Sequence, residues 1–172
     1  MAKWKGAHTL VESVAILRQR NIPAVLRLVG PWAQPEYKQR VIGLIETHRL
    51  GDAVEILGRV SDEELHRQYA VNRVYALPSQ CESFGIPAAE AMAFGTPVVS
   101  TTCCAISEIC APAGRFGPPE DPKWTANALE ELLTNDETWK TLSDAAQKRA
   151  STLKWGDCFK PLLRIEEIVG SN

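Results

Sequence analysis

One stretch decides the fold of this chain: Pro78-Ser-Gln-Cys-Glu82-Ser-Phe-Gly-Ile-Pro-Ala-Ala-Glu90-Ala-Met-Ala-Phe-Gly-Thr-Pro97. It predicts a strand end, a turn, a short helix that Pro87 opens and Gly95 closes, and the start of another strand. A helix start directs free N–H groups and the positive end of its dipole outward, which favours anions. The stretch therefore predicts an α/β fold with an anion site at this helix start.

Two glutamates, Glu82 and Glu90, stand eight positions apart, one before the helix and one inside it. Carboxylates repel phosphate, so we expect them to accept hydrogen bonds from hydroxyl groups beside the anion site. A ligand that carries both phosphate and hydroxyl groups satisfies the whole arrangement. The pattern therefore predicts a nucleotide sugar as the ligand.

The same stretch closely resembles the donor-binding motif of the retaining GT-B glycosyltransferases, in particular glycosyltransferase family four. That motif reads Pro-Ser…Glu-x-Phe-Gly…Glu-Ala-Met…Gly-x-Pro-Val, and each part of it stands between Pro78 and Val98. An ordered set of motifs over about 150 positions is specific evidence, whereas a single glycine pattern is weak. Further family-like positions are Lys5-Gly6, residues 25–30, residues 56–65, Tyr69 and Trp155.

The resemblance implies the C-terminal, nucleotide-sugar-binding half of such an enzyme. Its activity would be transfer of a hexose from a nucleoside-diphosphate sugar to an acceptor hydroxyl, with retention and with no metal or other cofactor. The resemblance gives catalytic roles to Glu82 and Lys5. The donor-binding residues that it implies are Glu82, Ser83, Phe84, Gly85, Ile86, Glu90, Arg59 and Val60.

Each charged residue of this set has an alternative role. Glu90 is expected to bind the ribose. The alternative is an ordinary glutamate near a helix start, whose charge stabilises the helix through its dipole by about 0.3–1 kcal/mol. Glu82 is expected to position the sugar and support an oxocarbenium-like state, rather than act as a nucleophile as in retaining glycosidases. Lys5 is expected to stabilise the departing diphosphate, and the alternative is a solvated helix-start lysine.

Short apolar runs alternate with helical patterns along the chain, which predicts a parallel, Rossmann-like sheet with helices on both faces. Ser61 and Glu64 form the pattern of a capping box. The ends of four strands, at Gly30, Gly58, Ser79 and Thr101, are expected to converge on one crevice. The expected strands cover residues 24–29, 53–57, 73–77, 97–101 and 114–117, and the expected helices 7–20, 35–50, 62–70, 86–94 and 122–134. We predict a single domain over residues 1–172, with a Rossmann-like core over about 1–135 and C-terminal helices over 136–172.

In the family, a central strand precedes the Lys-Gly motif, but this chain begins at Met1, after that strand would have ended. Losing a central strand opens a gap of roughly 4.8 Å, which residues 24–29 and 73–77 must close or another segment must fill. Our hypothesis is a fragment or one piece of a split enzyme that lacks its N-terminal acceptor domain and is inactive alone. The alternatives are a non-catalytic donor-binding subunit and a sugar-nucleotide epimerase of similar architecture.

Composition excludes other classes of function. The chain has 19 basic and 21 acidic residues and no basic run, so nucleic acid is not an expected partner. No apolar run reaches the roughly 20 residues that span a bilayer. Five cysteines and three histidines show no metal-ligand spacing. We expect reduced cysteines and surface histidines at His8, His48 and His66. We also expect a cytoplasmic protein, with peripheral membrane association of the full-length enzyme left open.

The loop Thr101-Thr-Cys-Cys-Ala-Ile-Ser-Glu108 stands where the family has Gly-Gly-x-Pro-Glu. Cys103 and Cys104 in place of glycines should stiffen this loop, and we expect both to be small buried hydrophobic residues. The nucleotide base, the sugar and the acceptor are left open by the sequence.

Overall fold

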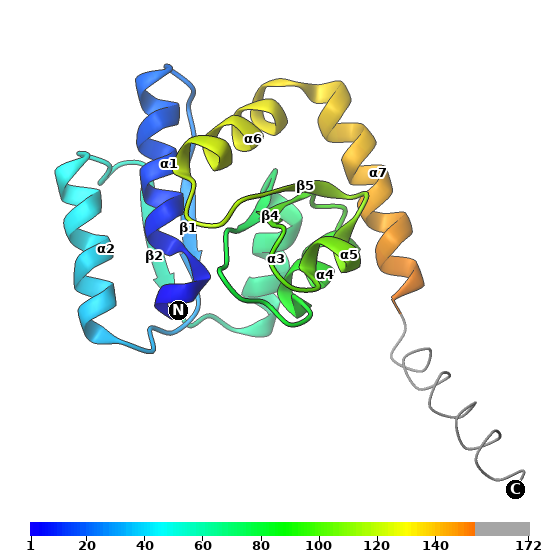
Figure 1. The fold of residues 1–172 in the computed structure, drawn as a ribbon, viewed down its shortest axis with the longest axis horizontal. Coiled ribbons are helices and arrows are strands. Elements are labelled where there is room, and N and C mark those ends of the chain that lie inside the picture. Colours follow the sequence, from blue (N-terminus) through cyan, green and yellow to red (C-terminus); the bar gives the residue numbers. More distant parts are fainter. Residues whose placement is uncertain (154–172) are drawn as a thin grey trace, which may run out of the picture.

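The computed structural model describes residues 1–153, which form parallel strands flanked by helices (Figure 1). The strands are β1 (Leu26–Val29), β2 (Val54–Gly58), β3 (Tyr75–Leu77), β4 (Val98–Thr101) and β5 (Gly114–Gly117). The helices are the 3-10 turn η1 (Lys3–Lys5), α1 (Ala7–Gln19), α2 (Pro35–Thr47), α3 (Asp62–Val71), α4 (Ile86–Ala93), α5 (Ile106–Cys110), α6 (Pro122–Thr134) and α7 (Asp136–Thr152). The predicted strands and helices up to residue 153 are confirmed, whereas η1 and α5 were not predicted. Trp155 and the helix predicted after it lie outside the described residues.

The strands form two parallel sheets, of order β1-β2 and β3-β4-β5. Adjacent residues of β4 show that helices cover both faces of the second sheet. Val98 packs in a cluster with Met92 of α4 and Ile106 of α5, whereas Val99 packs with Leu17 of α1 and Leu132 of α6. Successive side chains of a strand point to opposite faces, so the α/β layering is confirmed.

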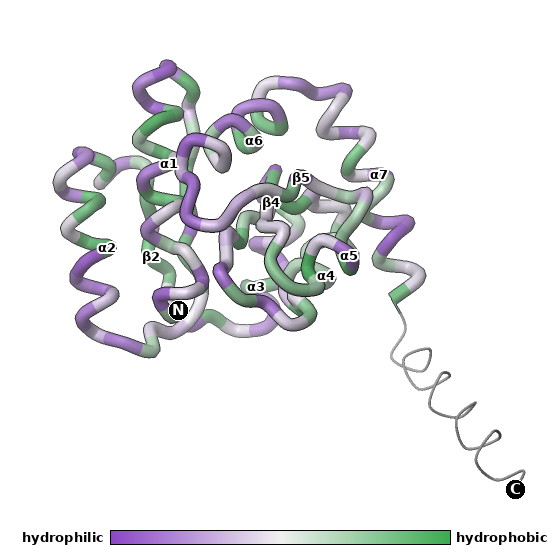
Figure 2. The backbone as a smooth tube through the Cα atoms, viewed as in Figure 1, coloured by the Kyte–Doolittle hydropathy of each residue, from purple (hydrophilic) through white to green (hydrophobic). Residues whose placement is uncertain are grey.

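Helix α2 buries one stripe of side chains. In α2 the buried residues are Tyr37, Val41 and Ile45, spaced four apart, which places them on one side of the helix. Figure 2 shows the corresponding alternation of hydrophilic and hydrophobic stretches along α2. This stripe packs with β1 and β2 in one apolar cluster.

The gap expected from the absent central strand is present between β1 and β3. These two strands belong to different sheets, and a cavity of about 550 Å³ lies between them, lined by residues 25–31 and 74–77. A second, smaller cavity of about 100 Å³ is lined by Val25 and Val74, at the amino ends of the same two strands. Within the described residues the strands have therefore neither closed up nor accepted another strand between them.

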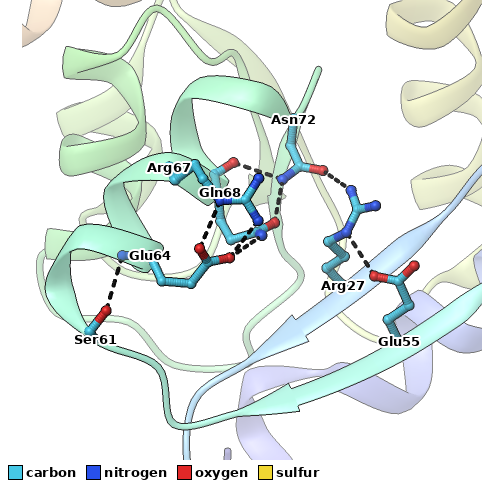
Figure 3. Close-up of polar contacts among 7 residues, drawn as sticks. All are labelled: Arg27, Glu55, Ser61, Glu64, Arg67, Gln68 and Asn72. Carbon is cyan, nitrogen blue, oxygen red and sulfur yellow. Dashed lines mark hydrogen bonds and ion pairs between the residues drawn. The ribbon is translucent and has the colours of Figure 1, made fainter.

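Polar side chains bridge the two sheets beside this gap (Figure 3). Arg27 of β1 donates to Glu55 of β2 at 2.8 Å and to the Asn72 side chain, just before β3, at 3.0 Å. Asn72 in turn donates to Gln68 of α3 at 2.9 Å. This chain of hydrogen bonds fixes α3 relative to β1 without direct strand pairing.

The start of α3 confirms half of the predicted capping box. The backbone N–H of Glu64 donates to the Ser61 hydroxyl at 3.2 Å. The Glu64 carboxylate instead accepts two hydrogen bonds from Arg67 and one from Gln68 (Figure 3). These donors, Arg67 foremost, lower the pKa of Glu64 to about 2.

The surface position predicted for His8 is wrong, because this side chain is buried in the first turn of α1. The Tyr37 hydroxyl oxygen accepts from the backbone N–H of His8 at 3.2 Å and lies 2.8 Å from Nδ1 of the ring. The hydroxyl oxygen has two lone pairs, so the bond to Nδ1 is either donated by the Tyr37 hydroxyl or accepted from a protonated Nδ1. Burial, with a smaller effect of Arg40, lowers the pKa of His8. His48 and His66 are exposed, as predicted.

This buried imidazole predicts a stability that falls as the pH is lowered below about 6.5, the ordinary histidine pKa. In that range the unfolded chain takes up a proton that the folded chain excludes, so the free energy of unfolding rises with pH. Urea unfolding at pH 7.5 and at pH 5.5 would measure the difference. The rise in the free energy of unfolding from pH 5.5 to pH 7.5 should be smaller in His8→Gln and unchanged in His48→Gln. An unchanged rise in His8→Gln would contradict the role of His8 in this pH dependence.

Candidate functional site

The carboxyl ends of the strands are joined by short hydrogen bonds. Gly30 donates to the Gly58 carbonyl at 2.6 Å, which joins the ends of β1 and β2. The Thr101 hydroxyl donates to the Ser79 carbonyl at 2.7 Å, which joins β4 to the residues after β3. Each of these two pairs of strand ends is thus in direct contact. Of the four residues expected to converge on one crevice, Gly30 is among those that line the large cavity, and Gly58, Ser79 and Thr101 are not.

The N-terminal turn is anchored to the same edge. The Trp4 carbonyl accepts from the backbone N–H of Gln80 at 2.8 Å and lies 2.9 Å from the Ser79 hydroxyl. Gly6 has φ +75°, and a Cβ placed there would stand 2.4 Å from the Pro78 carbonyl oxygen. Only glycine allows this approach, which carries Lys5 to the loop that follows β3.

Lys5 and Glu82, 77 positions apart, form an ion pair there. Lys5 Nζ lies 2.6 Å from Glu82 Oε2, and the side chains are 34% and 11% exposed. The structure therefore brings together the two residues to which the family resemblance assigns catalytic roles. The pair is a short charge-assisted contact at the rim of the crevice.

Helix α4 begins at Ile86, four residues after Glu82. Gly85 takes the left-handed conformation, φ +79°, and no side chain caps the helix start. Ser83 is exposed, Phe84 half-buried and Ile86 47% exposed, so this loop faces outward at the rim. A helix start is thus confirmed at the predicted position, and its role as an anion site stays a prediction.

Glu90 lies exposed in α4 and accepts a hydrogen bond from the Tyr69 hydroxyl of α3 at 3.0 Å. Burial first, and then the Glu90 charge, raise the pKa of Tyr69. Burial also raises the pKa of Tyr75 in β3, where the charges of Glu82 and Glu90 both contribute. The charges of both carboxylates therefore act on the same buried tyrosine.

Arg59 and Val60 follow β2 and line the large cavity together with Lys5, Tyr69 and Pro87. Glu82 and Glu90 do not line it, but each is bonded to a residue that does. The residues predicted to hold a base and a diphosphate thus line one cavity, and the residue predicted to hold a ribose is bonded to a lining residue. Tyr69 was missed as a site residue, and its family-like position was the available signal.

The burial expected for Cys103 and Cys104 is wrong. Cys103 is half-buried and Cys104 is exposed, with a left-handed φ of +55°. The Cys104 sulfur lies 3.9 Å from the sulfur of Cys81, which is also exposed. The loop after β4 therefore meets the loop after β3 through two accessible thiols.

Gly6→Ala is expected to destabilise the fold by about 2–4 kcal/mol, because the new methyl group adds left-handed strain to a clash with the Pro78 carbonyl. It should also move Lys5 away from Glu82. Urea unfolding measures the first effect. Gly43→Ala is the matched control, since nothing lies within 4 Å of a Cβ there and alanine in α2 should stabilise by about 1 kcal/mol. Equal stability of the Gly6 variant and the parent would contradict the predicted clash.

Comparison with known protein families identifies the family of this chain. The family described as "Glycosyl transferases group 1" matches residues 1–149. The chain belongs to this family of GT-B-type glycosyltransferases.

Curated relatives are longer than this chain. D-inositol 3-phosphate glycosyltransferase of Corynebacterium urealyticum is 30% identical over 171 residues, which cover 96% of this chain and 40% of that protein. MMP alpha-(1->4)-mannosyltransferase of Mycolicibacterium hassiacum is 34% identical over 150 residues, or 85% of this chain and 35% of that protein. The chain thus spans about 40% or less of the length of these two relatives.

Solved structures share the fold. Sucrose-phosphate synthase from Thermosynechococcus elongatus superposes with a TM-score of 0.81 at 31% identity, over 98% of this chain and 43% of that one. Anabaena HepE in complex with UDP and glucose superposes with a TM-score of 0.82 at 24% identity, over 99% of this chain and 46% of that one.

Among residues 1–153, no helix is both long and apolar enough to cross a bilayer. In the same range, no group of three or more His, Cys, Asp or Glu side chains is arranged to hold a metal ion.

Proposed function

We propose that this chain is the donor-binding half of a retaining glycosyltransferase that transfers a hexose from a nucleoside-diphosphate sugar to an acceptor hydroxyl. The observation that carries the proposal is the Lys5–Glu82 pair, 2.6 Å apart beside the uncapped start of α4, with Glu90 further along the same helix. A cation and an acid beside a helix start, with a second acid in the same helix, suit a ligand with phosphate and hydroxyl groups.

In this proposal Lys5 leaves Glu82 and binds the diphosphate of the donor. Negative charge builds on that diphosphate as the glycosidic bond breaks, and a fixed cation stabilises it more in the transition state than in the ground state. We assign this role to Lys5 and propose no metal or other cofactor. The uncapped N-terminus of α4 adds its dipole to the same task.

The released Glu82 carboxylate then accepts hydrogen bonds from the sugar and supports positive charge near the anomeric carbon. Glu90 binds the ribose hydroxyls, and its bond from Tyr69 holds the carboxylate in one orientation. Arg59 and Val60 contact the base, while Ser83, Phe84, Gly85 and Ile86 contact the sugar and the distal phosphate.

The acceptor half is proposed to lie outside this chain. The support is the length of the relatives, together with Trp4 and Ile86, which are each 47% exposed at the rim of the site. Exposed apolar side chains beside a binding site are typical of a surface that another domain covers. The proposed location is the cytoplasm, on the basis of the odd number of cysteines.

Titration calorimetry with UDP, GDP and ADP tests the proposal. We expect weak but measurable binding of at least one of them, and slow or absent hydrolysis of the matching hexose donors. The absence of binding by all three at millimolar concentration would contradict the proposal. Formation of an epimer from UDP-glucose or GDP-mannose would favour the epimerase alternative instead.

A further inference from the structure

Two exposed thiols meet next to the proposed donor site. Cys81 follows β3 and directly precedes Glu82, and Cys104 lies in the loop after β4. Their sulfur atoms are 3.9 Å apart, although the residues are 23 positions apart in the chain. Both are accessible to solvent and to small molecules.

We propose that Cys81 and Cys104 form a reversible modification site, a dithiol that a small disulfide such as glutathione disulfide converts to an intramolecular disulfide. A disulfide bond is about 2.05 Å long, so each sulfur must move by only about 1 Å from its present position. Both cysteines lie in loops rather than in strands or helices, so side-chain rotation and small loop shifts can supply this movement.

The surroundings select this pair over the other described cysteines. Cys110 is fully buried, and burial raises its pKa to about 11, which keeps it protonated and inert near neutral pH. Cys103 is half-buried, and its backbone N–H donates to the Thr101 hydroxyl at 3.4 Å. Cys81 and Cys104 are both exposed, with sulfur atoms 3.9 Å apart, so either thiol can be attacked by the other once it carries glutathione.

The reaction is a double thiol–disulfide exchange. The Cys104 thiolate attacks one sulfur of glutathione disulfide, forms a mixed disulfide and releases one glutathione thiolate. The Cys81 thiolate then attacks the Cys104 sulfur, forms the intramolecular bond and releases the second glutathione thiolate. The two cysteines lose two electrons and two protons, and one glutathione disulfide becomes two glutathione thiols.

The bond has a consequence for donor binding, which rests on the proposed function. Glu82 follows Cys81 in the chain and must leave Lys5 when a donor binds. The Cys81 carbonyl already lies 2.8 Å from the Ser79 hydroxyl, so a further covalent tie leaves this loop little freedom. Oxidation should therefore weaken binding of a nucleoside-diphosphate hexose by about three- to tenfold, comparable to the loss of one hydrogen bond.

The site itself is tested by peptide mapping. A Cys158→Ser chain is equilibrated with reduced and oxidised glutathione at increasing ratios, and then digested without reduction. We expect one linkage, joining the peptides that contain Cys81 and Cys104, in the parent and in a Cys103→Ser variant. Cys81→Ser should give only a glutathione adduct. Free thiols at both positions under oxidising conditions, or a linkage of Cys81 to Cys103, would overturn the proposal.

The consequence is tested by titrating UDP-glucose and GDP-mannose into reduced and oxidised chains. We expect weaker binding after oxidation of the parent, recovery with dithiothreitol, and no change in Cys81→Ser. If the mapped disulfide form binds the donor as tightly as the reduced chain does, the proposed effect of oxidation on donor binding is wrong. Binding by neither form would instead count against the proposed function, and the mapped linkage would still decide whether the modification site exists.

Discussion

Replacing Glu90 by alanine is expected to lower the affinity for the preferred nucleoside diphosphate by about 10- to 100-fold. Hydrogen bonds to a charged group contribute about 1.5–3 kcal/mol each, and one carboxylate can accept from two vicinal ribose hydroxyls. Glu90 is exposed, and its one side-chain hydrogen bond within the described residues is with Tyr69, so we expect its removal to leave the fold intact. Titration calorimetry of the variant against the parent measures the loss.

Two controls separate a ribose contact from a general loss of negative charge. Glu63→Ala removes an exposed carboxylate from α3 and should leave nucleotide affinity unchanged. The 2′,3′-dideoxy form of the same diphosphate should bind the parent and the Glu90→Ala variant equally. A loss of equal size for the natural and the dideoxy ligand would remove Glu90 from the ribose.

Tyr69→Phe should have a smaller effect in the same direction. It deletes the hydroxyl that holds Glu90 and leaves the carboxylate itself in place. The expected loss is about two- to tenfold, the range of one neutral hydrogen bond. Because the ring stays, its edge-on packing against Tyr75 at 5.9 Å is kept, and the thermal unfolding temperature should change little. A loss as large as that of Glu90→Ala would indicate a direct contact of Tyr69 with the nucleotide.

Much of this fold was predictable because its strands are short apolar runs between clear turn signals. Residues 114–117 were predicted as a strand with the bounds that β5 has. Helix α5 was missed because five residues show no helical period. The split of the sheet between β1 and β3 was expected from the absent central strand, whereas the bridge from Arg27 to Asn72 was not, because contacts of this kind leave no spacing pattern.

The site was predictable in its residue types and less so in its contacts. Glu82 and Glu90 belong to one local motif, so spacing alone placed them near one helix start. Lys5 reaches Glu82 through the Gly6–Pro78 approach, a tertiary contact that no local pattern encodes. Cys104 was misjudged for the same reason: cysteine composition favours burial, but the loop after β4 turns this side chain outward beside Cys81.

Replacing Lys5 by methionine is expected to lower the affinity for nucleoside diphosphates by about 10- to 100-fold, with far less effect on the corresponding nucleoside. Methionine keeps most of the apolar stem and removes the charge that the diphosphate would bind. Lys3→Met, two positions earlier and exposed, is the matched control and should change affinity little. If both variants lose the same amount, general electrostatic attraction rather than a Lys5 contact accounts for binding.

Glu82→Gln is expected to raise the affinity for the same nucleoside diphosphate that Lys5→Met should weaken. In the parent, Lys5 must leave a carboxylate 2.6 Å away before it can bind phosphate, and that separation subtracts from the binding free energy. The amide of glutamine holds Lys5 less strongly, so UDP or its counterpart should bind several-fold more tightly, within the roughly 1.5–3 kcal/mol of a charge-assisted bond. Hydrolysis of the hexose donor should fall in the same variant, because the carboxylate that supports the sugar is gone. Tighter diphosphate binding together with slower turnover would separate the two roles proposed for the pair, whereas loss of both would mean that Glu82 serves only to hold Lys5 in place.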